Sequence, residues 1–258
     1  MAKPADTWDP VQYRRFAAER RRPFDELLAL VDPAPGGTAV DLGCGTGELT
    51  AELHRHLGAA STVGVDTSPA MLEQARTHTV AGLRFELADL ATWEPEAPLD
   101  IVFANASLQW VPDHPALLAR LAGLLVPGGQ LAFQVPANHD HPAHTVAAAL
   151  GAERGLRAVG PAASVPPPEQ YATVLHGLGL VDLHVRMQVF GFELPDTAEL
   201  VEWTRGTLLT GYRGQLEPEQ YEAFEAEYRQ RLLAELGDRR PYYYPFKRIL
   251  VHARRPAG

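Results

Sequence analysis

A glycine-rich turn preceded by an acidic residue is the feature of this 258-residue sequence most suggestive of chemistry. The run Asp41-Leu-Gly-Cys-Gly-Thr-Gly47 falls where an apolar strand pattern at 38–43 gives way to a helical pattern at 48–57. Glycine allows positive φ and lets a ligand approach without a Cβ clash. The spacing G-x-G-x-G differs from the dinucleotide fingerprint G-x-G-x-x-G, and no phosphate-loop lysine follows it. Because Asp41 would repel a pyrophosphate, the turn predicts a cationic, amino-bearing ligand.

Polar side chains recur where the next apolar runs end. Asp66, Asp89 and Asn105 each follow a short strand pattern. In open α/β sheets, ligands bind in the crevice at the carboxyl ends of the strands. Asp66 is placed to accept two ribose hydroxyls, and Asp89 with a nearby backbone N–H to read an adenine edge. Each residue alone would be an ordinary turn or cap residue, but the ordered set predicts one continuous binding edge.

The first half of the chain has the elements needed to position these side chains. Short apolar runs alternate with helical patterns, which is typical of a parallel α/β sheet. Ser68 followed by Pro69 predicts a helix start, and Asp113 predicts another. The expected strands span residues 38–43, 61–66, 83–88, 100–104 and 130–135.

The second half is less regular. Residues 136–168 are rich in Ala, Pro, Gly and His and predict a long connection. A helix near 169–177 and a strand near 182–192 follow, then two helices, the second from Glu217, and a last strand from Arg248 to Ala253. No linker marks two independent domains, so the helices between the last two strands are expected to cap the sheet.

Composition excludes several classes of protein. The chain is 46% hydrophobic and 21% charged, as expected for a globular protein, and no apolar run is long enough to span a membrane. Its first residues lack the apolar core of a signal peptide. The single cysteine, Cys44, excludes an internal disulfide and predicts a reducing, cytoplasmic location. The net charge of −9 argues against nucleic acid as a partner.

The motifs together resemble those of class I S-adenosylmethionine-dependent methyltransferases. The run 41–47, Asp66 and Ala88-Asp89-Leu90 match that superfamily's cofactor motifs in order and spacing. The resemblance implies S-adenosylmethionine as the cofactor and a Rossmann-like α/β fold. Its sheet would have seven mostly parallel strands with the last strand antiparallel.

The same resemblance implies where the cofactor lies. The methionine moiety would lie near Gly43 and Gly45, the ribose on Asp66, and the adenine beside Asp89 and Met71. The full set of expected cofactor-binding residues is Tyr13, Arg20, Asp41, Gly43, Cys44, Gly45, Gly47, Asp66, Thr67, Met71, Ala88, Asp89, Leu90 and Asn105.

Two further segments narrow the resemblance. Residues 8–23, from Trp8 to Pro23, and residues 103–114, from Phe103 to His114, are similar to the trans-aconitate methyltransferases, as are 135–138 and 201–207. That family esterifies one carboxylate of trans-aconitate. The similarity implies a small, anionic polycarboxylic acid as the methyl acceptor.

The N-terminal segment has a face suited to an anion. Tyr13, Phe16 and Arg20 fall at i, i+3 and i+7, so a helix would place them on one side. An inward arginine needs an anionic partner, here a carboxylate of the cofactor or of the acceptor. The alternative is that Arg20 snorkels or pairs with Glu19 or Asp25.

The expected parts of the chain are a helical segment covering the cofactor at 1–35 and a methyltransferase domain at 36–258 whose helical cap spans about 194–241.

Five residues are expected to position the acceptor. Gln109 and Trp110 follow the fourth strand, where the transferred methyl group would project. Gln109 can donate a hydrogen bond to a carboxylate, and Trp110 either walls the transfer channel or packs in the core. Arg205, Arg213 and Arg248 would grip carboxylates.

Two features of the cap region leave alternatives open. The three arginines could instead be surface charges paired with Glu202 or Glu217. Where the family has an arginine in the run Leu208-Leu-Thr-Gly-Tyr-Arg213, this chain has Thr210.

A carboxylate acceptor is ionised at neutral pH, with a reference pKa of about 4, so the reaction needs no general base. Another acid, a phenol or an amine remains an alternative acceptor, the last two requiring a base such as His139 or His114. More distant alternatives are an NAD-dependent oxidoreductase, disfavoured by the glycine spacing, and a module that binds the cofactor without catalysis. The grouping of His139, His141 and His144 suggests zinc only weakly, and a solvated loop without metal is expected.

Overall fold

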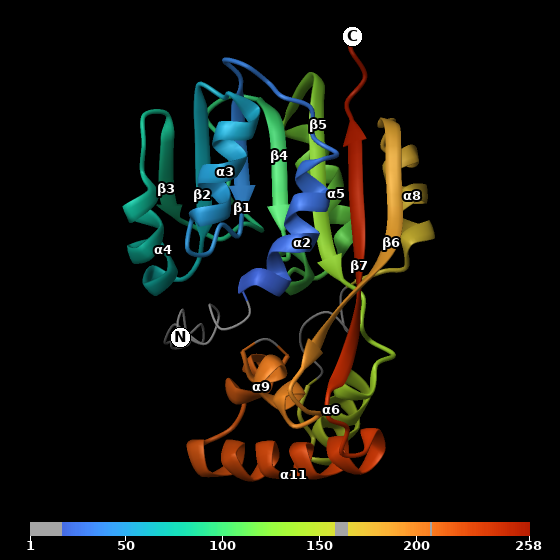
Figure 1. Cartoon of the computed structure of the whole chain (residues 1–258). Coiled ribbons are helices and arrows are strands. Elements are labelled where there is room, and N and C mark those ends of the chain that lie inside the picture. Colours follow the sequence, from blue (N-terminus) through green and yellow to red (C-terminus); the bar gives the residue numbers. More distant parts are fainter. Residues whose placement is uncertain (1–16, 158–164, 207) are drawn as a thin grey trace.

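The predicted alternation of strands and helices forms one layered molecule (Figure 1). The computed structural model describes residues 17–157, 165–206 and 208–258, with the backbone alone for 17–20. Within these ranges seven strands form a single sheet. They are β1 Thr38–Leu42, β2 Ser61–Asp66, β3 Leu83–Leu87, β4 Leu99–Asn105, β5 Leu125–Pro136, β6 Val181–Leu194 and β7 Tyr242–Arg254.

The strand order is β3-β2-β1-β4-β5-β7-β6. Strands β1 to β5 pair in parallel, whereas β7 pairs antiparallel with both β5 and β6. Only the last strand therefore runs against the others. The expected Rossmann-like, mostly parallel sheet is confirmed.

Helices cover both faces of the sheet (Figure 1). Two of the predicted starts are capped as expected: the Ser68 hydroxyl accepts the Met71 N–H, and the Asp113 carboxylate accepts the Ala116 N–H. The helices and short 3-10 turns are α2 Ala17–Leu28, α3 Glu48–Leu57, α4 Pro69–Ala75, η1 Arg76–His78, η2 Leu108–Trp110, α5 His114–Gly123, α6 Pro142–Glu153, α8 Pro168–Gly177, α9 Glu199–Arg205, α10 Thr210–Arg213 and α11 Pro218–Leu236.

Two large apolar clusters hold the layers together. One contains Phe24 and Leu27 of α2 with Leu53 of α3, and the other contains Leu117 of α5 with Tyr171 of α8. The first cluster continues into α6, α9 and α11, which lie beyond the carboxyl end of the parallel strands (Figure 1). Strands β6 and β7 extend past the sheet into this helical layer, so the two layers share continuous backbone.

The expectation of an irregular connection over 136–168 was wrong in its middle, where α6 forms. Pro142 occupies the first helical turn, and His141 caps the helix by accepting the Ala143 N–H at 3.1 Å. Ala147 and Leu150 are buried in the first apolar cluster. Alanine is the strongest helix former, so the composition that suggested a loop also suits a helix. None of the helices described is long and apolar enough to cross a membrane.

Strand β7 also begins earlier than expected, at Tyr242 instead of Arg248. Tyr242, Tyr244 and Phe246 are buried, while Tyr243 is 60% exposed. This alternation is the normal period-2 pattern of a half-buried strand. The alternation of aromatic residues over 242–246 thus indicates in the sequence that the strand begins at Tyr242.

Candidate active site

The glycine turn follows β1. Gly43, Gly45 and Gly47 all have positive φ, at 85°, 54° and 77°. A Cβ on Gly43 would lie 2.2 Å from the Ser107 Cβ, whereas a Cβ on Gly45 would meet none of the described residues within 4 Å. The Ser107 hydroxyl also donates to the carbonyl of Leu42. Gly43 is therefore needed for close packing, whereas Gly45 is not crowded by the described residues.

Asp66 ties this turn to the end of β2. Its Oδ2 accepts the Gly45 N–H and its Oδ1 accepts the Ser68 N–H, each at 2.9 Å. A carboxylate offers about four acceptor sites, so these two bonds fix its orientation without exhausting its capacity. The side chain is half-buried at the sheet edge.

Asp41 presents a buried acceptor to the same region. It is 3% exposed, and its Oδ2 accepts the Thr50 hydroxyl at 2.6 Å. Among the residues described, its Oδ1 has no hydrogen-bond partner. Burial raises the pKa of Asp41 to about 7, although the Thr50 hydrogen bond opposes the shift. A desolvated carboxylate of this kind is suited to a positively charged donor.

The other expected cofactor residues follow the same edge. Asp89 is exposed, and its Oδ1 accepts the Ala91 N–H at 2.9 Å. Met71 of α4 is buried, and Thr67 is exposed. Burial raises the pKa of the Cys44 thiol, as do the nearby charges of Asp41 and Asp66, so the thiol stays protonated. Ala88 and Leu90 are half-buried on either side of Asp89.

The segment after β4 forms the next part of the edge. Asn105 accepts a hydrogen bond from the Gln134 side-chain amide of β5 at 2.8 Å. The Gln109 amide donates to the Ala106 carbonyl at 2.7 Å. Trp110, at the end of η2, is 37% exposed. The segment thus carries one internally anchored amide and one surface aromatic ring.

Of the three arginines expected at the acceptor, Arg205 and Arg213 both lie near Tyr221 of α11, whereas Arg248 lies on β7. Arg205 pairs with Glu202 at 2.9 Å and with Glu225, and Arg213 lies over the Tyr221 ring. Arg248 is different: it is 8% exposed, and its strand position pairs with Pro136 at the end of β5.

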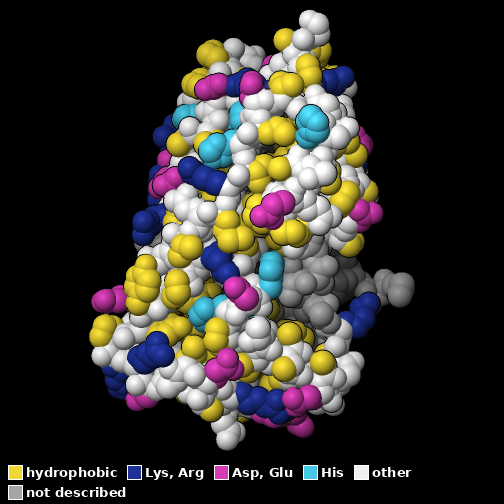
Figure 2. Space-filling model, turned by 90° about the vertical axis from the view of Figure 1, so that its right-hand side faces the viewer, with side chains coloured by type: hydrophobic (Ala, Val, Ile, Leu, Met, Phe, Trp, Pro, Cys, Tyr) yellow, Lys and Arg dark blue, Asp and Glu magenta, His cyan; other side chains and the backbone are white. Residues whose placement is uncertain are grey.

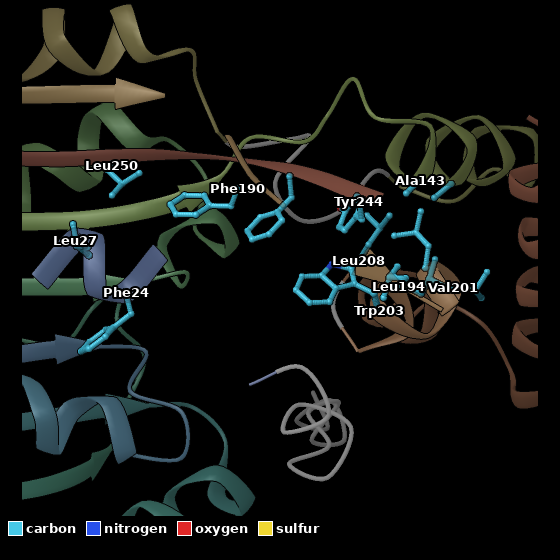
Figure 3. Packing of buried hydrophobic residues seen from close by; sticks show 14 of the residues in the cluster. Phe24, Leu27, Ala143, Phe190, Leu194, Val201, Trp203, Leu208, Tyr244 and Leu250 are labelled. Atoms are coloured by element: carbon cyan, nitrogen blue, oxygen red, sulfur yellow. The ribbon is translucent and has the colours of Figure 1, made fainter. Parts of the chain in front are cut away.

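An aromatic cluster lies between the sheet and the helical layer. Figure 3 shows Trp203 and Tyr244 in this position, with Phe190 toward the sheet. Ring centroids are 5.9 Å apart for Trp203 and Tyr244, and 4.9 Å apart for Phe192 and Trp203. Phe246 belongs to the same cluster, and the guanidinium carbon of Arg248 lies 5.4 Å from its ring. Sequence analysis did not single out these aromatic residues.

Comparison with known proteins decides the family. Residues 39–129 match the family described as a methyltransferase domain. The trans-aconitate 2-methyltransferase of Deinococcus radiodurans is 43% identical over 258 residues, which cover 97% of this chain and 99% of that protein. The protein of the same name from Mycobacterium sp. strain KMS is 37% identical over 96% of this chain and 99% of its own.

This chain belongs to the trans-aconitate 2-methyltransferase family. The predicted family, enzyme class and S-adenosylmethionine dependence are thereby confirmed.

Solved structures agree with this fold. The phosphoethanolamine N-methyltransferase 2 of Haemonchus contortus is 18% identical, with a TM-score of 0.55 over 90% of this chain and 52% of its own. An S-adenosylmethionine-dependent methyltransferase from Mesorhizobium loti is 23% identical, with a TM-score of 0.51 over 90% of this chain and 96% of its own.

Within this family member, the histidines considered as bases lie in different settings. His114 is 1% exposed, and both ring nitrogens have partners, so it is not free to deprotonate an acceptor. His139 is half-buried in the segment after β5. His144 is 9% exposed in α6, so the expected solvated loop was wrong for it. The residues described include no group of three side chains able to hold a metal ion.

Several expectations for this methyltransferase concern residues with no described side chain. Tyr13 and Phe16 lie outside the described residues, and Arg20 is described by its backbone alone, within α2. Thr210, where an arginine was expected, is buried at the start of α10.

Proposed function

We propose that the protein transfers a methyl group to one carboxylate of a small polycarboxylic acid such as trans-aconitate. The observation that carries the proposal is the 43% identity to a protein named for this reaction, over nearly the whole of both chains. That similarity covers the helical layer as well as the sheet. Arg248 and the helical layer, which lie outside the methyltransferase domain at 39–129, would select the acceptor together with Gln109 and Trp110 from within it.

The glycine edge fits the methionine end of the cofactor. The Oδ1 of Asp41, which has no hydrogen-bond partner among the described residues, would accept from the α-amino group, and the methionine chain would lie beside Gly45. Asp66 would accept the ribose hydroxyls, and Asp89 and Met71 would border the adenine. When bound, the cofactor supplies a methyl group on a sulfonium centre, which an ionised carboxylate can attack directly.

The chain's own part in the reaction is to bind, orient and dehydrate the acceptor. Arg248 would hold a carboxylate through its fork of N–H donors, close to the end of β5. Gln109 and Trp110 would border the reacting oxygen, and the aromatic cluster would exclude water. Because the nucleophile is already ionised, the engagement of both His114 nitrogens does not hinder this chemistry.

The expected division of the chain belongs to the same proposal. Residues 1–35 would cover the cofactor, and residues 194–241 would cap the acceptor within the domain 36–258. Tyr13 and Arg20 would contribute to the cofactor or acceptor carboxylate. The single, buried Cys44 supports a cytoplasmic location.

The charge distribution supports a small anionic acceptor over nucleic acid. On the face shown in Figure 2, basic and acidic side chains of the described residues are interspersed and do not form a basic field. The net charge is −9. Local arginines, not a long-range field, would therefore attract the acceptor, because charges are screened beyond about 8 Å at physiological salt.

A screen for methylated products tests the proposal. Purified protein with S-adenosylmethionine is incubated with small polycarboxylates, phenols and amines, and products are identified by mass spectrometry. We expect methyl esters of trans-aconitate or a close analogue. Better turnover of phenols or amines would contradict the carboxylate acceptor while leaving the methyltransferase assignment intact.

A pair of arginine variants locates the acceptor. Arg248→Ala should lower kcat/KM at least about 30-fold, since truncating a buried arginine that grips a carboxylate costs about 2–5 kcal/mol. Arg205→Ala is the matched control and should change kcat/KM less than about twofold, because its guanidinium is engaged by two glutamates. Equal effects of the two variants would contradict the assignment of Arg248.

A further inference from the structure

Two buried side chains form a hydrogen-bonded relay behind the segment that borders the proposed acceptor site. Tyr171 of α8 is fully buried and His114 of α5 is 1% exposed. The Tyr171 hydroxyl lies 2.5 Å from Nδ1 of His114, and Nε2 of His114 lies 3.1 Å from the carbonyl oxygen of Leu108 in η2. The relay therefore joins α8, through α5, to η2.

The chemistry of the three groups determines which atom donates and which accepts in each of the two hydrogen bonds. A carbonyl oxygen can only accept, so Nε2 of His114 carries the proton and donates it to Leu108. The other nitrogen of a neutral imidazole is an acceptor, and it takes the Tyr171 hydroxyl proton. Burial lowers the pKa of His114, although the Leu108 hydrogen bond and the Asp113 charge oppose the shift, so the ring stays neutral.

The segment held by this relay follows an uncommon backbone path. Ala106 and Asp113, which flank η2, both have φ of 54°, a conformation that residues other than glycine rarely adopt. The Leu108 carbonyl accepts the Val111 N–H at 2.9 Å as well as the imidazole N–H. Backbone in sparsely populated conformations persists only where the surroundings fix it. The hydrogen bonds from Tyr171 to His114 and from His114 to Leu108 help to hold η2 in this conformation.

We propose that Tyr171 and His114 are positioning residues for methyl transfer, holding η2 so that Gln109 and Trp110 keep their places beside the acceptor. The inference rests on the proposed function, because it takes η2 to border the acceptor. It differs from a catalytic role for His114, since neither ring nitrogen is available to the acceptor. It also gives α8 a part in activity although the helix lies behind the sheet (Figure 1).

Removal of one hydroxyl group tests the relay. Tyr171→Phe keeps the ring that packs 5.3 Å from Phe133 but leaves Nδ1 of His114 without its donor. We expect kcat/KM for trans-aconitate to fall about tenfold, while the Kd for S-adenosylhomocysteine changes less than twofold. His114→Gln, whose amide can still donate to Leu108, should retain more activity than His114→Ala.

Thr62→Val is the matched control. Thr62 is also fully buried, and its hydroxyl lies 2.8 Å from Nδ1 of His54, at the amino end of β2 and away from the acceptor site. Both variants should lose similar thermal stability, but only Tyr171→Phe should lose kcat/KM when assayed well below Tm. Equal kcat/KM in the two variants would contradict the positioning role of Tyr171 and His114.

Variants of η2 separate this inference from the proposed function. Gln109→Ala and Trp110→Ala should each lower kcat/KM for trans-aconitate. If they do and Tyr171→Phe does not, the relay alone is wrong. If Tyr171→Phe lowers kcat/KM and they do not, the effect does not pass through η2 and the relay is again wrong. If the wild-type protein methylates no polycarboxylate, the proposed function fails, and the same comparison on the true acceptor decides the relay.

Discussion

The glycine edge and the helical layer hold their polar side chains in different ways. At the edge, Asp66 is fixed by two backbone N–H groups, one from Gly45 and one from Ser68. In the helical layer, Arg205 is held by two carboxylates, and its side chain remains 41% exposed. Backbone donors cannot be moved by substitution, whereas exposed ion pairs contribute little and are easily rearranged.

This difference indicates which part of the molecule has a geometry set by the backbone and which part has a geometry set by side chains. The proposed cofactor edge depends on the path of the backbone through the turn, so its geometry is set by glycines and strand ends. The proposed acceptor site would depend on long side chains such as Arg248 and on aromatic packing around Trp203. On this proposal, substitutions at these side chains would change the acceptor without disturbing the cofactor edge.

The largest expected effect is at Gly43, where backbone and packing requirements coincide. Gly43→Ala would place its Cβ 2.2 Å from the Ser107 Cβ at a φ of 85°. Overpacking costs about 1–3 kcal/mol and the left-handed conformation about 1–2, so unfolding free energy should fall by up to about 5 kcal/mol. Denaturant unfolding measures this loss.

Gly45→Ala is the matched control for that experiment. Its Cβ would meet nothing within 4 Å in the described parts of the chain, so we expect only the left-handed strain, and stability should fall by about 1–2 kcal/mol. Cofactor affinity should nevertheless fall, because the added methyl group enters the space beside the turn. Equal stability of the two variants would contradict the claim that Gly43 is required for close packing against Ser107.

A smaller effect is expected when Asp41 is replaced: stability should rise while cofactor binding weakens. The pKa of Asp41 in the folded protein is about 7, above its ordinary value of 3.8, so its contribution to stability is present below pH 4 and lost as pH rises to 7. By linkage the loss is up to about 4 kcal/mol. Asp41→Asn should therefore raise Tm at pH 8 without cofactor, while weakening cofactor binding measured by calorimetry.

Either half of that result can contradict the assignment. An unchanged Tm at pH 8 would mean that the Asp41 carboxylate is not destabilised by burial. Unchanged cofactor affinity would mean that its Oδ1 does not face the amino group. The pH 4 comparison is the internal control, because there the wild-type carboxyl is protonated and the two proteins should be similarly stable.

The smallest effect is expected at His144 in the helical layer. Burial, with the charges of His139, His141 and Arg248, lowers its pKa to about 4 from 6.5, and only Asp140 opposes the shift. Stability from the neutral ring is present above pH 6.5 and is lost as pH falls toward 4, by at most about 3 kcal/mol. His144→Asn should flatten the fall in unfolding free energy over this range. A variant with the same pH slope as the wild type would rule out His144 as its source.

The sheet could be predicted because its signals are local. Helix α3 and strand β2 begin and end where the sequence predicted, at 48–57 and 61–66. The caps Ser68 and Asp113 also act as expected. Each of these signals spans only a few residues, so tertiary packing did not need to be known.

The contacts of the helical layer and of α8 could not be predicted in the same way, because the residues that meet are distant in the sequence. Arg205 meets Glu225 20 residues away, and Tyr171 meets His114 57 residues away. No periodicity indicates which arginine pairs with glutamates and which is buried on β7. The helix over 142–153 was missed for a different reason: its alanines and histidines were interpreted as loop composition.

The place where the helical layer joins the sheet has a consequence for protein engineering. Leu194, which ends β6, pairs directly with Tyr242, which begins β7. The helices α9, α10 and α11 are thus an insertion whose two ends meet at one point on neighbouring strands. Closing a loop costs little more as it lengthens, about 0.6 kcal/mol per doubling. Because α11 packs against α6, an exchange of the insertion between relatives should carry α6 with it, with β6 and β7 as splice points whose register is kept.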